Sequence, residues 1–302
     1  MKSRVTAVIP TRNRPRDLGK AVVSVRAQLR PPDEFIIVDQ SPGSESRDLV
    51  FSLMEDETRI QLVYIHDPRI TGLVDAKRVA AERSTGKIVC FLEDDVILEP
   101  EYLERIEQGF AEHPDMLGCC GIITNPPRQM PGYELVFHLF HRGIYRDIRV
   151  GIYGRGNKGA DQGLIKSDVL SGGLSAWRRE VFAAVPFDVT NGFFMLEDMD
   201  FSTRVVQCFG HRLYINPAAR LEHHWSPVNR EVLGPRQRRK LTEFISYYKK
   251  RRNWPGARLA LPWLLVGLLI EACVQSLSSR SLAPLTGYFA GLRDGFVKRI
   301  EA

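Results

Sequence analysis

Short apolar runs alternate with helical patterns through the first half of the chain, and this alternation limits the folds that the chain can adopt. The apolar runs lie at residues 6–9, 35–38, 62–65 and 88–92, and the helical patterns lie at residues 16–28, 45–54, 74–83 and 101–112. Strands that alternate with helices are typical of a parallel sheet covered by helices on both faces. We therefore predict an α/β fold with a mostly parallel central sheet.

Polar residues follow three of the four predicted strands. Residues 11–13 follow the first strand, Asp39 follows the second, and residues 93–95 follow the fourth. Ligands of α/β sheets bind beyond the carboxyl ends of the strands. These polar residues are therefore candidates for a ligand-binding edge.

Two acidic clusters indicate what this edge could bind. Glu93, Asp94 and Asp95 directly follow the apolar run 88–92, and a second cluster lies at residues 197–200. Carboxylates at the end of a buried strand repel one another and lose hydration, so such a cluster persists where a cation neutralises it. Hard divalent cations prefer oxygen ligands. The two clusters suggest a metal-bound phosphate and a separate catalytic base.

The regular pattern weakens between residues 126 and 168, in a stretch rich in glycine, arginine and aromatic residues. A long irregular stretch of this kind is typical of an insertion that faces a ligand. We expect a helix to begin near Arg178, another helix to follow Asp198, and a short strand to lie at residues 212–215.

Composition bounds the class of protein. The chain has 302 residues, 44% of them hydrophobic and 26% charged, which is ordinary for a soluble core in one large domain or one domain with an appendage. The five cysteines are odd in number and lack Cys-x-x-Cys spacing. They favour a reducing cytosolic setting and argue against a zinc site built from thiols. We expect no signal peptide, because residues 1–4 lead straight into a strand-like segment.

Positive charge is concentrated at the end of the chain. Residues 228–302 hold 14 Lys and Arg against 5 Asp and Glu, a net charge of +9, whereas residues 1–227 hold 28 against 31, a net charge of −3. A basic tail favours contact with anionic lipid headgroups. Because Phe244, Tyr247 and Tyr248 lie among the basic residues, nucleic-acid binding is an alternative, although we expect no nucleic-acid partner.

The tail also contains a charge-free apolar stretch at residues 259–270. Twelve residues of helix span about 18 Å, which is less than the hydrocarbon core of about 30 Å. Basic residues precede the stretch, and Trp254 and Trp263 lie near its start, as in helices that lie in the membrane interface. A helical hairpin that covers the rest of the chain or forms a dimer contact is the alternative.

Five short motifs occur in an order that resembles a known enzyme family. They lie at residues 8–14, 37–41, 91–95, 172–180 and 196–200. Each motif alone is weak, but five in sequence make a strong signal. Together they resemble the inverting family 2 glycosyltransferases of the GT-A fold, which is Rossmann-like. The resemblance divides the chain into a catalytic domain at residues 1–227, with an acceptor-side insertion at 126–168, and a basic helical tail at 228–302.

The resemblance implies a pocket for a nucleotide-diphosphate sugar. Asp39 matches the carboxylate that accepts a hydrogen bond from N3–H of uracil or thymine, which favours a UDP- or dTDP-sugar. Its alternative role is that of a turn residue. Further donor contacts are implied for Pro10, Thr11, Arg12, Gly173 and Lys77, the last standing where the family commonly has an arginine.

The resemblance also implies a metal site and a base. Asp95 would bind Mg²⁺ or Mn²⁺, with Glu93 and Asp94 as ribose contacts or metal support. His223 matches a histidine that binds the metal in some members, although it is equally typical of a core histidine.

Asp198 matches the general base that takes the proton of the acceptor hydroxyl, and Glu197 would position the acceptor. The Gln-x-x-Arg-Trp signature of processive synthases is incomplete at residues 237–240. We therefore expect transfer of single sugars to a cell-surface or lipid-linked glycan at the cytoplasmic face of the membrane.

Two alternatives use the same scaffold. A nucleotidyltransferase would carry a glycine-rich phosphate loop after the first strand, but residues 11–15 contain no glycine. A catalytically inactive glycan-binding homologue is disfavoured, because Asp95 and Asp198 are both present.

Overall fold

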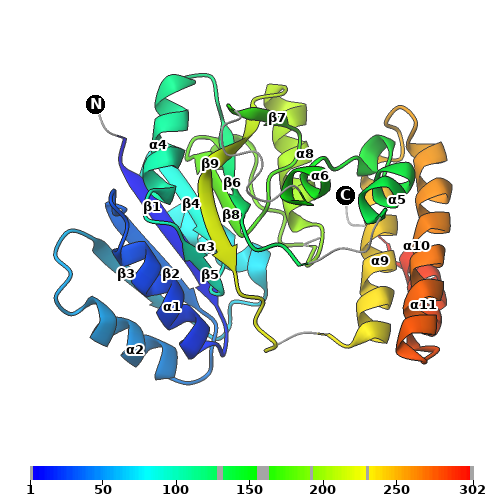
Figure 1. Cartoon of the computed structure of the whole chain (residues 1–302), viewed down its shortest axis with the longest axis horizontal. Coiled ribbons are helices and arrows are strands. Elements are labelled where there is room, and N and C mark those ends of the chain that lie inside the picture. The colour runs from blue at the N-terminus through cyan, green and yellow to red at the C-terminus, as the bar shows by residue number, and fades with distance from the viewer. Residues whose placement is uncertain (1–2, 128–131, 155–162, 191–192, 229–230, 300–302) are drawn as a thin grey trace. The chain divides into compact units, whose positions relative to one another are not determined.

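The computed structural model describes residues 3–127, 132–154, 163–190, 193–228 and 231–299 (Figure 1). They form two compact units. The first unit comprises Met1–Pro127 and Ile152–Val228, and the second comprises Arg128–Gly151 and Asn229–Ala302. The stretch 126–168, which the sequence analysis treats as one insertion of the catalytic domain, is thus divided between the two units.

A single mixed sheet forms the centre of the first unit. Its described strands are β1 (Val5–Thr11), β2 (Glu34–Asp39), β3 (Gln61–His66), β4 (Ile88–Leu92), β5 (Val96–Leu98), β6 (Gly118–Ile123), β7 (Ile165–Ser167), β8 (Leu174–Arg178) and β9 (Leu213–His223). The strand order is β3-β2-β1-β4-β8-β6-β9-β5, and β7 pairs with β9. The run from β3 to β4 is parallel, whereas β8 is antiparallel to both of its neighbours. The predicted α/β fold is confirmed.

Helices cover the sheet of the first unit. They are α1 (Pro15–Arg26), α2 (Glu45–Met54), α3 (Leu73–Arg83), α4 (Tyr102–Glu112), α7 (Val181–Ala184) and α8 (Glu197–Phe209), while α6 (Arg149–Gly154) spans the boundary of the units. Helices α1 and α2 pack on one another, and α3 returns across β2 and β1 to reach β4 (Figure 1). Because β1, β2 and β4 are parallel, their carboxyl ends meet at one edge. Thr11 and Asp39 are direct partners there.

Strand β8 ends at Arg178, and the helix predicted to begin near that residue is α7, which begins at Val181. Strand β8 lies antiparallel between β4 and β6, and α7 has only four residues. Trp177 is buried because its ring packs edge-on against Phe201 at a centroid distance of 4.9 Å. The helix predicted after Asp198 is α8, and the strand predicted at 212–215 is the start of β9.

The described part of the second unit is helical. It contains α5 (Tyr133–Phe140), the short 3₁₀ helix η1 (Gly143–Tyr145), α9 (Leu233–Arg251), α10 (Ala257–Ser279) and α11 (Ala283–Val297). Helix α11 lies against α9, and a Cβ added at Gly287 or Gly291 would overlap the α9 backbone. The Trp263 indole donates to the Leu139 carbonyl oxygen at 2.7 Å and so joins α10 to α5.

Helix α10 is longer than the charge-free stretch in the sequence suggests. It has 23 residues with a mean hydropathy of 1.8 in its most apolar part, and at about 1.5 Å per residue its length exceeds the hydrocarbon core of about 30 Å. The helix continues through Glu271, whose carboxylate pairs with Lys240 of α9 at 2.6 Å. Our length argument against a spanning helix was therefore wrong: by length and composition, α10 could cross a membrane.

Candidate active site

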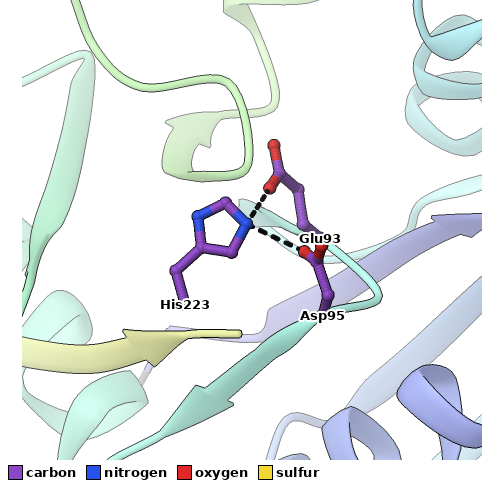
Figure 2. Close-up of side chains that lie close together, drawn as sticks. All are labelled: Glu93, Asp95 and His223. Carbon is purple, nitrogen blue, oxygen red and sulfur yellow. Dashed lines mark ion pairs between the residues drawn. The ribbon is translucent and has the colours of Figure 1, made fainter. Parts of the chain in front are cut away.

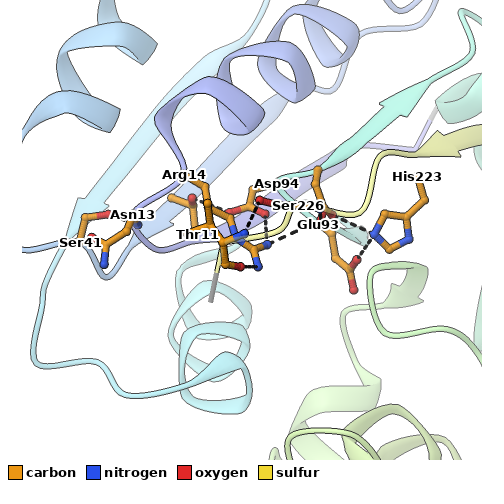
Figure 3. A network of polar contacts seen from close by, with 10 residues as sticks. Thr11, Asn13, Arg14, Ser41, Glu93, Asp94, His223 and Ser226 are labelled. Atoms are coloured by element: carbon orange, nitrogen blue, oxygen red, sulfur yellow. Dashed lines mark hydrogen bonds and ion pairs between the residues drawn. The ribbon is translucent and has the colours of Figure 1, made fainter. Parts of the chain in front are cut away.

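The acidic triplet lies at the edge where β1, β2 and β4 end. The Thr11 hydroxyl, at the end of β1, donates to Asp94 Oδ2 at 2.7 Å (Figure 3). Arg14 Nη1 lies 2.9 Å from Asp94 Oδ1. Burial raises the pKa of Asp94 to about 6, although Arg14 and Thr11 both favour its ionised form. The middle carboxylate of the triplet is thus tied to the protein rather than directed to solvent.

Arg14 is a site residue that the sequence analysis missed. Its guanidinium contacts Asp94, lies 3.7 Å from Asp95 Oδ2, and donates to the Val228 carbonyl oxygen at 2.6 Å (Figure 3). Arg12, which we predicted to contact the sugar nucleotide, is exposed. Pro15 gives the signal that could have separated them, because a proline in the first turn fixes the start of α1 and leaves Arg14 at its N-cap.

Glu93, Asp95 and His223 converge on one point (Figure 2). His223 Nε2 lies 3.0 Å from Glu93 Oε2 and 2.9 Å from Asp95 Oδ1. Antiparallel pairing of β5 with β9 explains the approach, since Val96 is opposite His223 and Asp95 precedes it. Trp225 stacks on the imidazole at a centroid distance of 4.4 Å. His224, by contrast, is exposed and pairs with Glu222 at 2.8 Å.

The electrostatics of this cluster favour positive charge between Glu93 and Asp95. Burial alone would raise the pKa of Asp95, but His223 and the Ser226 backbone N–H, which donates to Oδ2 at 2.8 Å, hold that pKa below its usual value. Burial alone would lower the pKa of His223, but Asp95 and Glu93 raise it to about 9. The two carboxylates and the imidazole thus stabilise one another's charged forms, with the positive charge held between Glu93 and Asp95.

The donor set also fits Mg²⁺ or Mn²⁺. Asp95 Oδ1 is buried and accepts no well-aligned hydrogen bond from the described residues, so its contact with His223 is an ion pair only. Two carboxylates and an imidazole within 4.8 Å of one another suit a divalent cation, and the imidazole favours Mn²⁺. Glu93, which we predicted as a ribose contact or metal support, lies with the candidate metal ligands.

Gly172 and Gly173 bring the second acidic cluster to the first. Because β8 runs antiparallel to β4, the two glycines before it lie beside the triplet, and Glu93 N donates to Gly173 O at 3.0 Å. A Cβ on Gly173 would overlap Glu93, and a Cβ on Gly172 would overlap Glu197. The paired glycines therefore make room for a carboxylate from each cluster.

Glu197 and Asp198 form the first turn of α8. Asp198 Oδ1 accepts a hydrogen bond from the Met199 backbone N–H at 2.6 Å. Glu197 Oε1 lies 2.8 Å from Lys77 Nζ, and burial raises the pKa of Glu197 although Lys77 opposes the shift. Both carboxylates line a small cavity together with Lys77 and Gly172. The structure thus places the predicted base beside the glycine pair that contacts the triplet.

Asp39, the predicted base-recognition residue, is fully buried at the end of β2. Its Oδ1 accepts from the Ser41 backbone N–H at 2.9 Å, and its Oδ2 accepts from the Tyr64 hydroxyl at 2.7 Å. Burial and the adjacent Asp39 raise the pKa of Tyr64 above its usual value. Each carboxylate oxygen can accept a further hydrogen bond. Pro10 is buried in β1 next to Thr11.

The family called Glycosyl transferase family 2 matches residues 6–185 of this sequence. The chain belongs to this family. The match covers β1 to α7, and so includes the acidic triplet and the glycine pair. It ends before α8 and β9, so the positions of Glu197, Asp198 and His223 are known from the structure alone.

Curated relatives of this family 2 chain are similar over shorter segments. An uncharacterized glycosyltransferase alr2836 from Nostoc sp. is 32% identical over 108 residues, which are 35% of this chain and 33% of that protein. The validoxylamine A glucosyltransferase of Streptomyces hygroscopicus subsp. limoneus is 30% identical over 38% of this chain and 26% of its own length. The putative teichuronic acid biosynthesis glycosyltransferase TuaG of Bacillus subtilis is 31% identical over 34% of this chain and 40% of its own length. The aligned segments thus span less than half of these relatives.

Solved structures of the GT-A fold align with nearly the whole chain. The mannosyltransferase PcManGT from Pyrobaculum calidifontis, solved with GDP-Man and Mn²⁺, aligns with 98% of this chain and 87% of its own, at a TM-score of 0.63 and 16% identity. S. aureus TarS 1–349 aligns with 97% of this chain and 80% of its own, at a TM-score of 0.61 and 13% identity.

Proposed function

We propose that this family 2 chain transfers single sugars from a nucleotide-diphosphate sugar to an acceptor hydroxyl, with inversion at the anomeric carbon and with the help of a divalent cation. The observation that carries this proposal is the meeting of two acidic groups across Gly172 and Gly173. On one side are Glu93, Asp95 and His223, which can hold a cation. On the other is Asp198, at the start of α8.

The first acidic group would bind the donor. Glu93, Asp95 and His223 would hold Mg²⁺ or Mn²⁺, which when bound neutralises the diphosphate and the charge that appears on the leaving nucleoside diphosphate. The solved complex of PcManGT with GDP-Man and Mn²⁺ supports this pairing of donor and metal in the same fold. Arg14 would keep Asp94 and Asp95 in place through its contacts with both carboxylates.

The second acidic group would activate the acceptor. Asp198 would take the proton from the acceptor hydroxyl as its oxygen attacks the anomeric carbon on the face opposite the departing diphosphate. The hydrogen bond from the Met199 N–H holds the Asp198 carboxylate at the start of α8. Incubation with a panel of sugar nucleotides and Mn²⁺ should release nucleoside diphosphate, and NMR of the product should show the inverted anomer. A retained anomer would contradict the mechanism.

The donor base is expected to be uracil or thymine. Thermal stabilisation by UDP and dTDP with Mn²⁺ should exceed stabilisation by GDP, and all three effects should shrink without metal. Asp39→Asn should weaken UDP binding about 10- to 150-fold, since a hydrogen bond to a charged group contributes about 1.5–3 kcal/mol. Asp56→Asn, at an exposed position after α2, serves as the matched control. Equal stabilisation by GDP would contradict the base assignment. Stabilisation by nucleoside triphosphates alone would favour a nucleotidyltransferase.

We also propose that the second unit docks on the inner face of the cell membrane, where it would meet a lipid-linked or cell-surface glycan acceptor. Exposed apolar side chains form a stripe on α10, spaced three or four residues apart as on a single helix face: Leu259, Trp263, Val266, Ile270, Val274 and Leu277. Arg252 and Arg258, both exposed, lie at the start of this stripe. An apolar stripe next to cationic side chains matches an anionic lipid surface. The similarity to TuaG supports a cell-surface glycan as the product.

Charges placed in the stripe should release the protein from membranes. Val266→Glu combined with Ile270→Glu should reduce flotation with vesicles that contain anionic lipid at least about tenfold, because each carboxylate opposes burial in the interface. Leu29→Glu, at a side chain 67% exposed in the first unit, is the matched control. Binding of RNA to the wild-type protein is measured in parallel by filter binding at several salt concentrations. Tight RNA binding without vesicle binding would overturn the membrane assignment.

A further inference from the structure

Lys77 carries a charge that the sequence resemblance assigns to binding of the sugar nucleotide, yet the structure buries it against Glu197 and Gly172. Its side chain extends from α3 and is 4% exposed. The ammonium lies 2.8 Å from Glu197 Oε1, donates to the Gly172 carbonyl oxygen at 3.0 Å, and lies 5.6 Å from the centre of the Phe91 ring. The two hydrogen bonds use two of the three donors of the ammonium, and the ring adds a cation–π contact. The charge is thus satisfied within the protein.

The contacts of Lys77 connect three segments of the site. Lys77 belongs to α3, Gly172 to the turn before β8, and Glu197 to the first turn of α8. A Cβ on Gly172 would overlap Glu197 and lie 2.8 Å from Lys77 Nζ. The glycine therefore permits the ion pair, and the ion pair fixes the helix start beside the glycine turn.

Asp198 depends on this arrangement, because it is the residue next to Glu197. A buried carboxylate without its cation is unfavourable and would turn outward or take up a proton. Either change would move the first turn of α8, and a shift of about 1 Å in a reacting group can cost about 100-fold in rate. Glu197, which we predicted to position the acceptor, faces Lys77 in the structure.

We propose that Lys77 is a positioning residue: through Glu197 and Gly172 it fixes the first turn of α8, so that Asp198 faces the acceptor, and it does not bind the donor diphosphate. This inference rests on the proposed function for the role of Asp198. The ion pair itself is independent of that role.

The test compares nucleotide binding with turnover. Lys77→Met keeps the length of the side chain and removes its charge. It should lower kcat about 100-fold, while the Kd for UDP with Mn²⁺, measured by calorimetry, should change less than about twofold. Lys77→Arg should recover part of kcat. Adding Glu197→Gln to Lys77→Met should lower kcat no further, because the pair acts as a unit. Arg78→Met is the control, since Arg78 pairs with Asp75 and Glu82 of its own helix.

Two outcomes would contradict the proposal. A Kd that weakens as much as kcat falls would make Lys77 a donor ligand, as the sequence resemblance implies, and an unchanged kcat would leave it no role in positioning. If Lys77→Met does not fold, Lys77→Arg and Glu197→Gln carry the same comparison. If no sugar nucleotide supports turnover, the proposed function fails. In that case urea unfolding still tests the ion pair, because strictly additive shifts of the midpoint in the double variant would overturn it.

Discussion

Asp198→Asn is expected to reduce sugar transfer by about 10²- to 10⁴-fold, the usual contribution of a positioned general base. Asparagine keeps the shape of the side chain and an oxygen that can accept the Met199 N–H, which Asp198 Oδ1 accepts at 2.6 Å. It cannot take a proton from the acceptor hydroxyl. The effect should fall on kcat, measured as nucleoside diphosphate released in the presence of acceptor.

Binding measurements separate loss of the base from loss of the site. The Kd of the Asp198→Asn variant for UDP with Mn²⁺ should stay within about twofold of the wild-type value, because Glu93, Asp95 and His223 form the candidate cation group without Asp198. Asp56→Asn, at an exposed position after α2, is the matched control for an Asp-to-Asn change. A variant that retains more than a tenth of the wild-type kcat would remove Asp198 from the role of base.

The edge of the sheet could be predicted from the sequence because its strands are strongly marked. Each apolar run of the first half lies within one of β1 to β4, and parallel strands must end on the same side. The approach of Thr11 to Asp94 follows from that rule. The approach of His223 to Asp95 does not, because it depends on the pairing of β5 with the end of β9. Only the family resemblance indicated it.

Side-chain direction was the part of the site that the sequence left open. Arg12 and Arg14 are both basic and lie in one loop, yet Arg14, at the start of α1, is half-buried against the triplet whereas Arg12 is exposed. In the sequence, Tyr64 is part of the apolar run of β3 and gives no sign of a role in the site. In the structure, its hydroxyl donates to Asp39. Lys77 matched a donor-binding position, but Gly172 leaves room for it to reach Glu197. These contacts depend on the packing of distant segments.

The length of α10 was missed for a related reason. A charged residue in an apolar run reads as an interruption, and Glu271 ended the predicted stretch. In the structure Lys240 of α9 neutralises Glu271, and the helix continues to Ser279. A helix can keep a carboxylate when a cation from its neighbour satisfies it. The hydropathy of the α10 segment alone gives no information about Lys240, because Lys240 belongs to another helix.

Loss of a candidate metal ligand should have the second large effect. Asp95→Ala and His223→Ala should each weaken Mn²⁺-dependent UDP binding about 100-fold or more, because loss of groups that only support a ligand already costs about 10- to 100-fold. Calorimetric titration with Mn²⁺ alone, and then with UDP, separates binding of the ion from binding of the nucleotide. Glu93→Gln belongs in the same series. Weaker binding of Mn²⁺ alone would make Glu93 a ligand, as its position 3.0 Å from His223 Nε2 suggests.

The adjacent histidine provides the matched control for this series. His224 follows His223 in the chain but pairs with Glu222 at 2.8 Å and is exposed. His224→Ala should therefore leave the affinity for Mn²⁺ unchanged within about twofold. Equal losses in the two histidine variants would indicate that the alanine substitutions disturb the end of β9 rather than a cation site. Unchanged Mn²⁺ affinity in Asp95→Ala would overturn the metal assignment, since Asp95 is the buried carboxylate around which Glu93 and His223 converge.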